Sequence, residues 1–410
     1  MNGLNLSEVS DIRLGSNTIN AIYYGSTLLW PLVPRDYSKE YLTIKAVSDA
    51  TVVFYKTSDE ISRTIQYSKN KRTWETISFG NFSDKDIPEA YKVSLLAGEK
   101  LYLKGSNSAY GDERGNYCSI NINEGSGNIS GNIMSLIYGD NFYGQTVLDT
   151  PYSFHRLFAS IRIGVMYEYN NIIDASNLIL PATTLADNCY FFMFESCISL
   201  TTAPELPATT LADGCYFGMF DNCESLTTAP ELHATTLADG CYSQMFQYCT
   251  SLTTAPELPA TTLSNRCYSE MFYYCRSLKT APELPATTLS NSCYSEMFYY
   301  CDELTSAPEL HATTLAIGCY SYMFKYCTSL TTAPELPATT LSNSCYFEMF
   351  DNCTSLNYIK CLATDISAID CLSGWVYGVA STGTFVKNPN MSNWTTGESG
   401  IPLGWTVKDA

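Results

Sequence analysis

Apolar residues in the second half of the chain fall in a regular pattern. The stretch "CYSEMFYYC" occurs twice, at Cys267–Cys275 and Cys293–Cys301. On a helix that turns about 100° per residue, its two cysteines, Tyr268, Met271 and Phe272 share one arc, and the more polar side chains share the other. The pattern therefore predicts an amphipathic helix that buries its thiols.

The same unit recurs with a fixed 26-residue period. Its first cysteine returns at positions 189, 215, 241, 267, 293, 319, 345 and 371. Seven near copies of "PATTLADGCYFGMFDNCESLTTAPEL" extend from residue 181 to residue 362. A fixed period of this length predicts a solenoid, whose units stack to share one core. In each unit, the Thr-Thr pair of "SLTTAPEL" favours a very short strand that ends at the proline.

The 17 cysteines have three possible roles: core packing, disulfide bonding and metal binding. A helical rise of about 1.5 Å per residue places the two cysteines of one unit roughly 12 Å apart, which is too far for a disulfide. A zinc site needs four converging ligands, and no histidine pattern accompanies the cysteines. Reduced thiols in the core are the main prediction, with disulfides between repeats and a metal site as alternatives.

The N-terminal half has a different pattern. Residues 1–34 predict a small hairpin, with Gly25–Ser26 at a turn and Leu28–Trp30 as an apolar strand. From Glu40 to about Leu148, short alternating runs such as "TVVFYKT" and "KLYLKG" are separated by turn residues. This spacing predicts a β-sandwich-like domain.

The recurring "C-Y-x-x-M-F-x-x-C-x-S-L-T" core resembles the BspA-like leucine-rich repeats of bacterial surface proteins, over roughly residues 130–410. The flanking Gly131–Phe142 and the C-terminal "GVASTGTFVKNPNMSNW" are similar to segments that accompany such repeats in proteins of gut bacteria and their phages. Two features depart from the pattern. His233 and His311 replace a proline, and the units lack the Asn ladder of classical leucine-rich repeats, which leaves the backbone of their turns open.

Pattern and resemblance together predict an α+β fold: an N-terminal β hairpin, a β-sandwich-like domain, and a leucine-rich-repeat-type α/β solenoid of 26-residue units. The predicted division is a short β docking segment (1–34), the β-sandwich-like domain (35–150), an N-terminal cap and linker (151–180), seven BspA-like repeats (181–362) and a C-terminal cap (363–410).

A second resemblance concerns the start of the chain. "LGSNTINAIYYGSTLLWP" (Leu14–Pro31) is similar to short segments of phage and prophage virion structural proteins. The two resemblances imply a virion structural or surface protein, of fibre or decoration type, that binds a host-surface glycan or protein. The N-terminal segment would contact other virion proteins. A bacterial cell-surface adhesin is the alternative, and the lack of a secretory signal at the N-terminus favours the virion.

Charge and composition exclude several other functions. The net charge of −18 disfavours a nucleic-acid partner, and no run approaches the ~18 apolar residues of a membrane span. No catalytic motif is present, so no enzymatic activity, cofactor or metal is expected.

The positions that vary between repeats indicate where a ligand binds. Tyrosines recur there in four consecutive units, and exposed tyrosine is typical of adhesive surfaces. The predicted ligand-binding residues are Tyr248, Tyr273, Tyr274, Tyr299, Tyr300, Tyr322 and Tyr326. The alternatives are that these tyrosines merely fill the surface, that the recurring Thr-Thr-x-Pro-Glu face binds instead, or that the face joins copies of a homo-oligomer.

Overall fold

The computed structural model describes residues 36–81, 90–163 and 166–410, together with four short strands near the N-terminus. Of these strands, β1 (Arg13–Leu14) pairs with β2 (Asn17–Thr18), and β3 (Ile22–Tyr24) pairs antiparallel with β4 (Thr27–Trp30). The second pair lies within the predicted hairpin, and its predicted turn at residues 25–26 is outside the described residues. No helix of the described residues is long and apolar enough to cross a lipid bilayer.

Two sheets form the domain that follows. The six-stranded sheet has the order β16-β13-β5-β11-β7-β8, and its strands are β5 (Leu42–Ala46), β7 (Thr64–Ser68), β8 (Glu75–Ser78), β11 (Lys100–Gly105), β13 (Gly127–Asn132) and β16 (Ile172–Ile179). The second sheet has the order β10-β6-β12, with a fourth strand beside β6; its strands are β6 (Ala50–Lys56), β9 (Gly80–Asn81), β10 (Tyr91–Leu95) and β12 (Cys118–Glu124).

Alternating side chains hold these sheets together. Leu42 and Ile44 of β5 share one apolar core with Val52 and Phe54 of β6. Short elements complete the domain: the 3₁₀ turns η2 (Tyr37–Lys39) and η3 (Gly139–Asn141), the helix α1 (Ser135–Tyr138), and the paired strands β14 (Ile161–Ile163) and β15 (Met166–Glu168). The strand β16 is the last one before the first repeat. The apolar core of the domain and that of the repeats form one cluster, to which β16 contributes.

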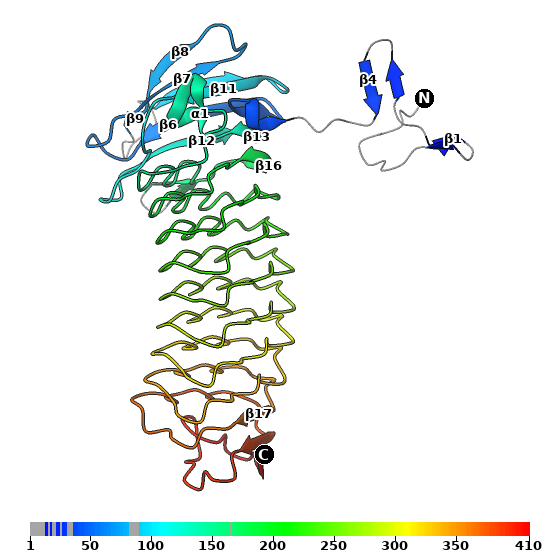
Figure 1. Ribbon diagram of the computed structural model, residues 1–410, viewed down its shortest axis with the longest axis vertical. Helices are drawn as coiled ribbons and strands as arrows, with labels where there is room; N and C mark the ends of the chain where they lie inside the picture. Colours follow the sequence, from blue (N-terminus) through cyan, green and yellow to red (C-terminus); the bar gives the residue numbers. More distant parts are fainter. Residues whose placement is uncertain are drawn as a thin grey trace.

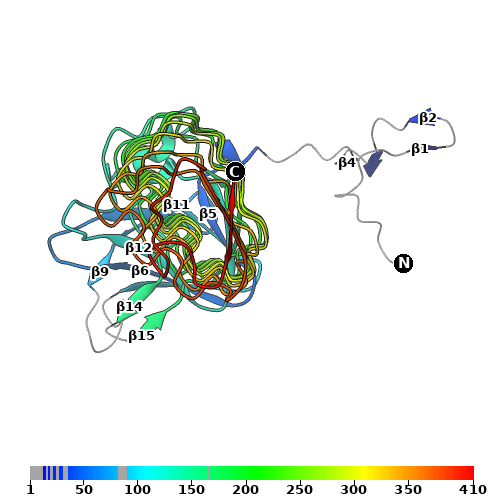
Figure 2. The same ribbon diagram turned by 90° about the horizontal axis from the view of Figure 1, so that it is seen from below.

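The prediction of an α+β fold with a leucine-rich-repeat-type α/β solenoid is wrong. The four residues of α1 form the one α-helix among the described residues, and the repeats contain none. Each 26-residue unit is instead a coil built of consecutive turns and short extended stretches, and these coils lie one above another below the β domain (Figure 1). Seen along this stack, the coils superimpose closely (Figure 2).

The backbone hydrogen bonds explain why the segment predicted as a helix forms turns. The N–H groups of Tyr268, Phe272 and Tyr274 donate to carbonyl groups of the next coil, at 2.7–3.0 Å. The N–H of Glu270 also donates to the next coil, and the N–H groups that alternate with these four donate to the carbonyl three residues earlier, as Met271 does to Tyr268. Neighbouring coils therefore satisfy half of these backbone donors, which an α-helix would satisfy internally.

The turns require a left-handed backbone at every fourth residue. In the fourth repeat Arg266, Glu270 and Tyr274 have φ of 53°, 57° and 63°. A backbone with a period of four residues turns the same side chains inward as an α-helix with 3.6 residues per turn, because the segment is short. The predicted buried face is therefore confirmed, since Cys267, Met271 and Phe272 are fully buried, although the element is not a helix.

Two columns of stacked aromatic rings fill the core of the coils. One contains Tyr268 with its equivalents above and below, and the other contains Phe272, whose ring centroid lies 5.8 Å from that of Phe246 and 5.7 Å from that of Phe298. Before the first repeat, the columns continue to Phe154 and Phe158, and the ring of Phe154 stacks in turn on Tyr110 of the β domain. They end on Trp375, which stacks against the ring of Tyr346.

A small parallel sheet closes the other end of the stack. Its strands are β17 (Tyr358–Cys361), β18 (Thr384–Lys387) and β19 (Thr406–Asp409). The ring of Trp375 packs there against Phe385 and Trp394, and its indole N–H donates to the carbonyl of Gly400 at 2.9 Å.

All 17 cysteines are free and buried, so the prediction of reduced core thiols is confirmed and no disulfide joins the repeats. The second cysteine of each coil also has a hydrogen bond that the sequence did not indicate. The thiol of Cys275 donates to the carbonyl of Phe246, 3.1 Å away in the preceding coil, and its equivalents do the same. Burial raises the pKa of these thiols, and that of Cys293 in the first column to about 12.

Short side-chain ladders join the coils at their surface. The carboxylate of Asp213 accepts from the backbone N–H of Asp239, whose own carboxylate accepts from the N–H of Asn265, both at 3.0 Å. Asn291 and Asn343 accept from Ile317 and Ile369 in the same way. The accepting residues stand in the "LAD" and "LSN" segments, where no sequence pattern indicated a ladder.

Candidate functional site

The seven predicted tyrosines form one continuous surface cluster, named here the tyrosine ladder. Ring centroids of Tyr274 and Tyr300 lie 4.7 Å apart, and those of Tyr300 and Tyr326 lie 4.2 Å apart with nearly parallel planes. Tyr273 and Tyr299 stack at 4.7 Å beside them. The remaining members, Tyr248 and Tyr322, contact these rings at 5.1 Å and 6.5 Å.

The ladder lies on the outside of the coils. Tyr248 is 37% exposed, and the other six side chains are partly exposed. Coil-to-coil hydrogen bonds fix the backbone beneath them, because the N–H of Tyr274 donates to the carbonyl of Tyr299 at 2.7 Å. The rings are therefore held in place by their neighbours while still presenting edges and hydroxyl groups to solvent, as a binding surface requires.

Five ladder residues occupy backbone positions that do not favour tyrosine. Tyr248, Tyr274, Tyr300 and Tyr326 have φ between 57° and 63°, and Tyr322 has φ of 57°. Bulky residues are rare in this left-handed region, whereas Asn and Gly adopt it readily. Coils at either side of the ladder have Asn222 and Asn352 at the same position. Stability alone would thus select Asn here, and this disfavours the view that the tyrosines merely fill the surface.

A cation whose side chain is 14% exposed lies at one end of the ladder. The ammonium group of Lys325 pairs with the carboxylate of Glu348, and with that of Asp351 at 2.7 Å. Its Nζ atom also lies over three rings, 5.3 Å from the centroid of Tyr322, 5.6 Å from Tyr326 and 5.9 Å from Tyr299. Burial lowers the pKa of Lys325, but the two carboxylates outweigh that effect and hold it above its usual range.

Carboxylates also line the ladder in the coils where no lysine is present. Glu270 accepts hydrogen bonds from the side-chain amides of Gln244 and Gln247, at 3.0 and 3.3 Å. Glu296 is partly buried, and desolvation together with the charge of Glu270 raises its pKa to about 7. Burial similarly raises the pKa of Asp221 to about 7. The repeats carry 18 acidic and 5 basic side chains between residues 181 and 362, a net charge of −13, so this surface repels anions.

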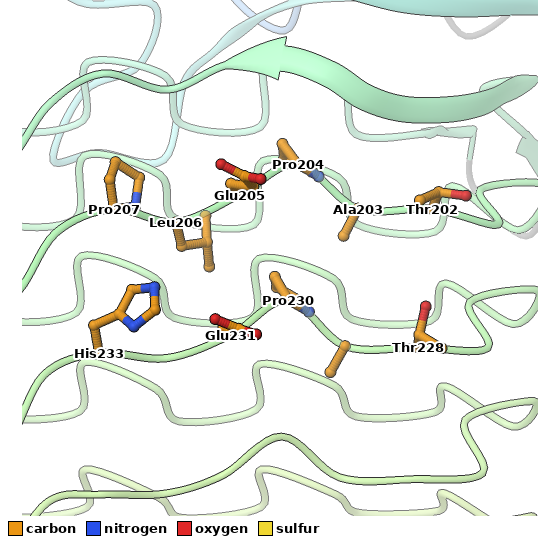
Figure 3. Close-up of a pocket in the computed structure, with 11 residues that line it drawn as sticks. Thr202, Ala203, Pro204, Glu205, Leu206, Pro207, Thr228, Pro230, Glu231 and His233 are labelled. Atoms are coloured by element: carbon orange, nitrogen blue, oxygen red, sulfur yellow. The ribbon is translucent and has the colours of Figure 1, made fainter. Parts of the chain in front are cut away.

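The recurring Thr-Thr-x-Pro-Glu face is hollowed between neighbouring coils (Figure 3). A groove of about 440 Å³ lies across two coils, between the segments Thr202–Pro207 and Thr228–His233. The exposed carboxylates of Glu205 and Glu231 stand one coil apart, and His233 lies below Pro207 in the same column. A similar groove of about 390 Å³ lies between the segments Ala255–Pro259 and Pro282–Pro285.

This groove is less specific than the ladder. Its walls combine proline and alanine with leucine and threonine, and each coil contributes a single exposed carboxylate. In the described ranges, no group of three or more His, Cys, Asp or Glu side chains is arranged to hold a metal ion. The groove can accept an extended chain, but it offers few groups that would fix one ligand in one orientation.

Sequence and structure agree on the ladder and differ on its surroundings. All seven predicted tyrosines come together, on consecutive coils. The sequence did not indicate that Lys325, Glu296 and Glu270 join them, because a helix prediction for one unit says nothing of contacts between units. An alignment of the repeat units could have shown a column of carboxylates, since Glu270, Glu296 and Glu348 occupy the same position in three units.

Neither a protein-family model, nor a curated protein, nor a solved structure matches this chain.

Proposed function

We propose that this protein is a virion surface protein, of fibre or decoration type, that attaches to a glycan or protein of the host-cell surface through the tyrosine ladder. The observation that carries the attachment role is the ladder itself. It comprises seven contacting tyrosines at a solvent-facing position, five of them at a left-handed backbone that would be more stable with Asn. Residues held in an unfavourable backbone conformation cluster at functional surfaces.

The geometry of the coils also suits attachment. Repetition places similar weak contacts at a constant spacing along a rod, and linked weak sites can raise avidity by ~10²–10⁴ without any single strong contact. The virion as carrier rests on the resemblance of Leu14–Pro31 to virion structural proteins. A bacterial cell-surface adhesin with the same repeats is the alternative, and it would use the same ladder.

Replacing Tyr274 and Tyr300 together by Asn should abolish most attachment to host cells, by ~10²-fold in avidity. Stability should change by less than about 1 kcal/mol, because Asn suits the left-handed backbone and the rings lie at the surface. Binding of the labelled full chain to cells and thermal unfolding give the two measurements. Thr261→Ala with Thr287→Ala, at exposed positions away from the ladder, is the control and should attach like the original chain.

A second pair tests the other face. The variant with Glu257→Gln and Glu283→Gln changes the groove of the Thr-Thr-x-Pro-Glu face. If this variant loses attachment while the Tyr274→Asn and Tyr300→Asn variant keeps it, that groove is the binding site and the ladder is not. A large loss of stability in the tyrosine pair would show that the rings serve the fold or an interface between copies.

The location is tested separately. Mass spectrometry of purified virions should detect the chain as a particle component, and a chain that lacks residues 1–34 should be absent from particles. The truncated chain should still show the thermal unfolding of the coil stack, since it keeps the whole of the described core, which runs from Leu42 to Trp405. Finding the intact chain on the bacterial surface and never in particles would favour the adhesin.

A further inference from the structure

An amine and a carboxyl group are held together between the sixth and seventh repeats. The Nζ atom of Lys325 lies 2.7 Å from a carboxyl oxygen, Oδ2, of Asp351, which stands at the equivalent position one repeat later. Both side chains are largely out of water, at 14% and 9% exposure. Lys387 and Asp409 pair at a similar distance of 2.6 Å, but there the carboxyl side chain is 62% exposed. The first pair is therefore both close and shielded.

The two coils fix these groups in place. The backbone N–H of Tyr326 donates to the carbonyl of Asp351 at 2.8 Å, so the backbones are joined directly beside the two side chains. The rings of Tyr299, Tyr322 and Tyr326 lie around Nζ, with their centroids 5.3–5.9 Å away. A nitrogen in hydrogen-bond contact with a carboxyl oxygen lies roughly 3.5 Å from the carboxyl carbon, and such fixed proximity can equal a concentration of ~10⁵–10⁸ M.

Two further side chains supply what the formation of an amide requires. The carboxyl group of Glu348 contacts Nζ of Lys325 and is within hydrogen-bonding reach of the Asp351 carboxyl, so it can carry a proton from the amine to the acid. The side-chain amide of Asn352 donates to Oδ1 of Asp351 at 2.6 Å. This donor would stabilise the negative charge that develops on Oδ1 when the carboxyl carbon is attacked.

Burial favours the uncharged forms of both reacting groups. It raises the pKa of Asp351, and the Glu348 carboxyl adds to that effect while the ammonium group opposes it. Burial also lowers the pKa of Lys325, although the two carboxylates together hold it above its usual range. The unreacted pair is thus mostly ionic, and reaction proceeds from the small fraction in which a proton has moved to a carboxylate. A step that occurs once in the life of the chain needs no larger fraction.

We propose that Lys325 and Asp351 form an amide bond with each other in the folded chain, with Glu348 as the catalytic residue. One proton of the ammonium group passes through Glu348 to Oδ2 of Asp351, and the free amine attacks Cγ. The bond between Nζ and Cγ forms, and the bond between Cγ and Oδ2 breaks. A second proton from Nζ passes through Glu348 to the departing oxygen, which leaves as water. Glu348 ends in its starting state, and no oxidant or other co-reactant is consumed.

This bond goes beyond the proposed attachment function and does not depend on it. It would close a loop of one repeat and tie the seventh coil covalently to the sixth, at the end of the tyrosine ladder. Such a closure restricts the unfolded chain, so it should raise the stability of this part of the stack.

Mass spectrometry of the purified full chain tests the bond. The intact mass should be lower than the mass of the sequence by one water molecule, and a protease digest should contain a branched peptide that joins Lys325 to Asp351. Lys387 and Asp409 are the internal control, because they are equally close but their carboxyl group is exposed. Their peptides should remain unlinked.

Two variants test the roles of the residues. Lys325→Arg keeps the positive charge but has no amine that forms this bond, so it should show the full mass and a lower unfolding temperature than the original chain. Glu348→Gln keeps both reacting groups and should slow the linking reaction at least ~10²-fold, because the proton carrier is lost. The linked fraction is followed over time after expression, and circular dichroism shows whether each variant is folded.

A full mass in the original chain would overturn the inference. A loss of water that persists in Lys325→Arg would overturn it as well, because an aspartate can also lose water by ring closure with its own backbone. Linking at the original rate in Glu348→Gln would reject the catalytic role of Glu348. The branched peptide of the original chain decides on the bond itself even where a variant does not fold.

Discussion

Inserting one glycine between Met271 and Phe272 is expected to lower the free energy of unfolding by more than about 4 kcal/mol. The insertion shifts every later residue of the turn segment by one position. Phe272 and Cys275 would then leave the core, and N–H groups that donate to the next coil would exchange places with those that close turns. Urea unfolding followed by circular dichroism provides the measurement.

The same insertion between Thr288 and Leu289 should cost far less. The chain already absorbs a register change in the equivalent stretch of its last coil. Thr340 pairs with Asp365, one position short of the usual repeat, whereas the N–H of Tyr346 donates to Cys371 at the same interval as its equivalents in the other coils. One extra residue therefore lies between these points. Equal loss of stability from both insertions would show that the turn segment does not set the register.

Replacing Phe272 by Ala is expected to destabilise the protein by about 3–5 kcal/mol, the usual cost of removing a fully buried aromatic ring. The ring stacks on its equivalents in both neighbouring coils, so its loss leaves a gap that the hydrogen-bonded coils cannot close. Thermal and urea unfolding of the full chain measure the effect.

Tyr274→Asn is the control for this substitution, because it removes a nearby aromatic ring that lies at the surface. It should change stability by less than about 1 kcal/mol. Similar losses in the two variants would mean that the ladder is as much a part of the core as the phenylalanine column, and would weaken its assignment as a binding surface.

Burial within the repeats could be predicted because it depends on side-chain chemistry and on spacing. Cys267, Tyr268, Met271, Phe272 and Cys275 are all inside, as expected from their pattern alone. The conformation that buries them could not be predicted in the same way. A helix and a run of four-residue turns bring these positions inward equally well, and so short a segment cannot separate a period of 4 from one of 3.6.

The candidate site was predicted in part for a related reason. The tyrosines were found because they recur at one position in successive units, which any stack of repeats would align. Their contacts with Lys325 depend on how the columns lie beside one another across the coil surface. That arrangement follows from the left-handed turn geometry, which strong helix formers such as Glu270 do not suggest.

The sequence by itself determined the period of the repeats, the inward face of each unit, the reduced state of its thiols and the position of the tyrosine ladder. The first three follow from a pattern that recurs in every unit, and the ladder follows from tyrosines at one position of four consecutive units. Only the tertiary structure decided between helix and turns, because the deciding hydrogen bonds join residues of neighbouring coils. A single unit cannot make those bonds, so its own sequence favours the helix, and the stack of coils selects the turns.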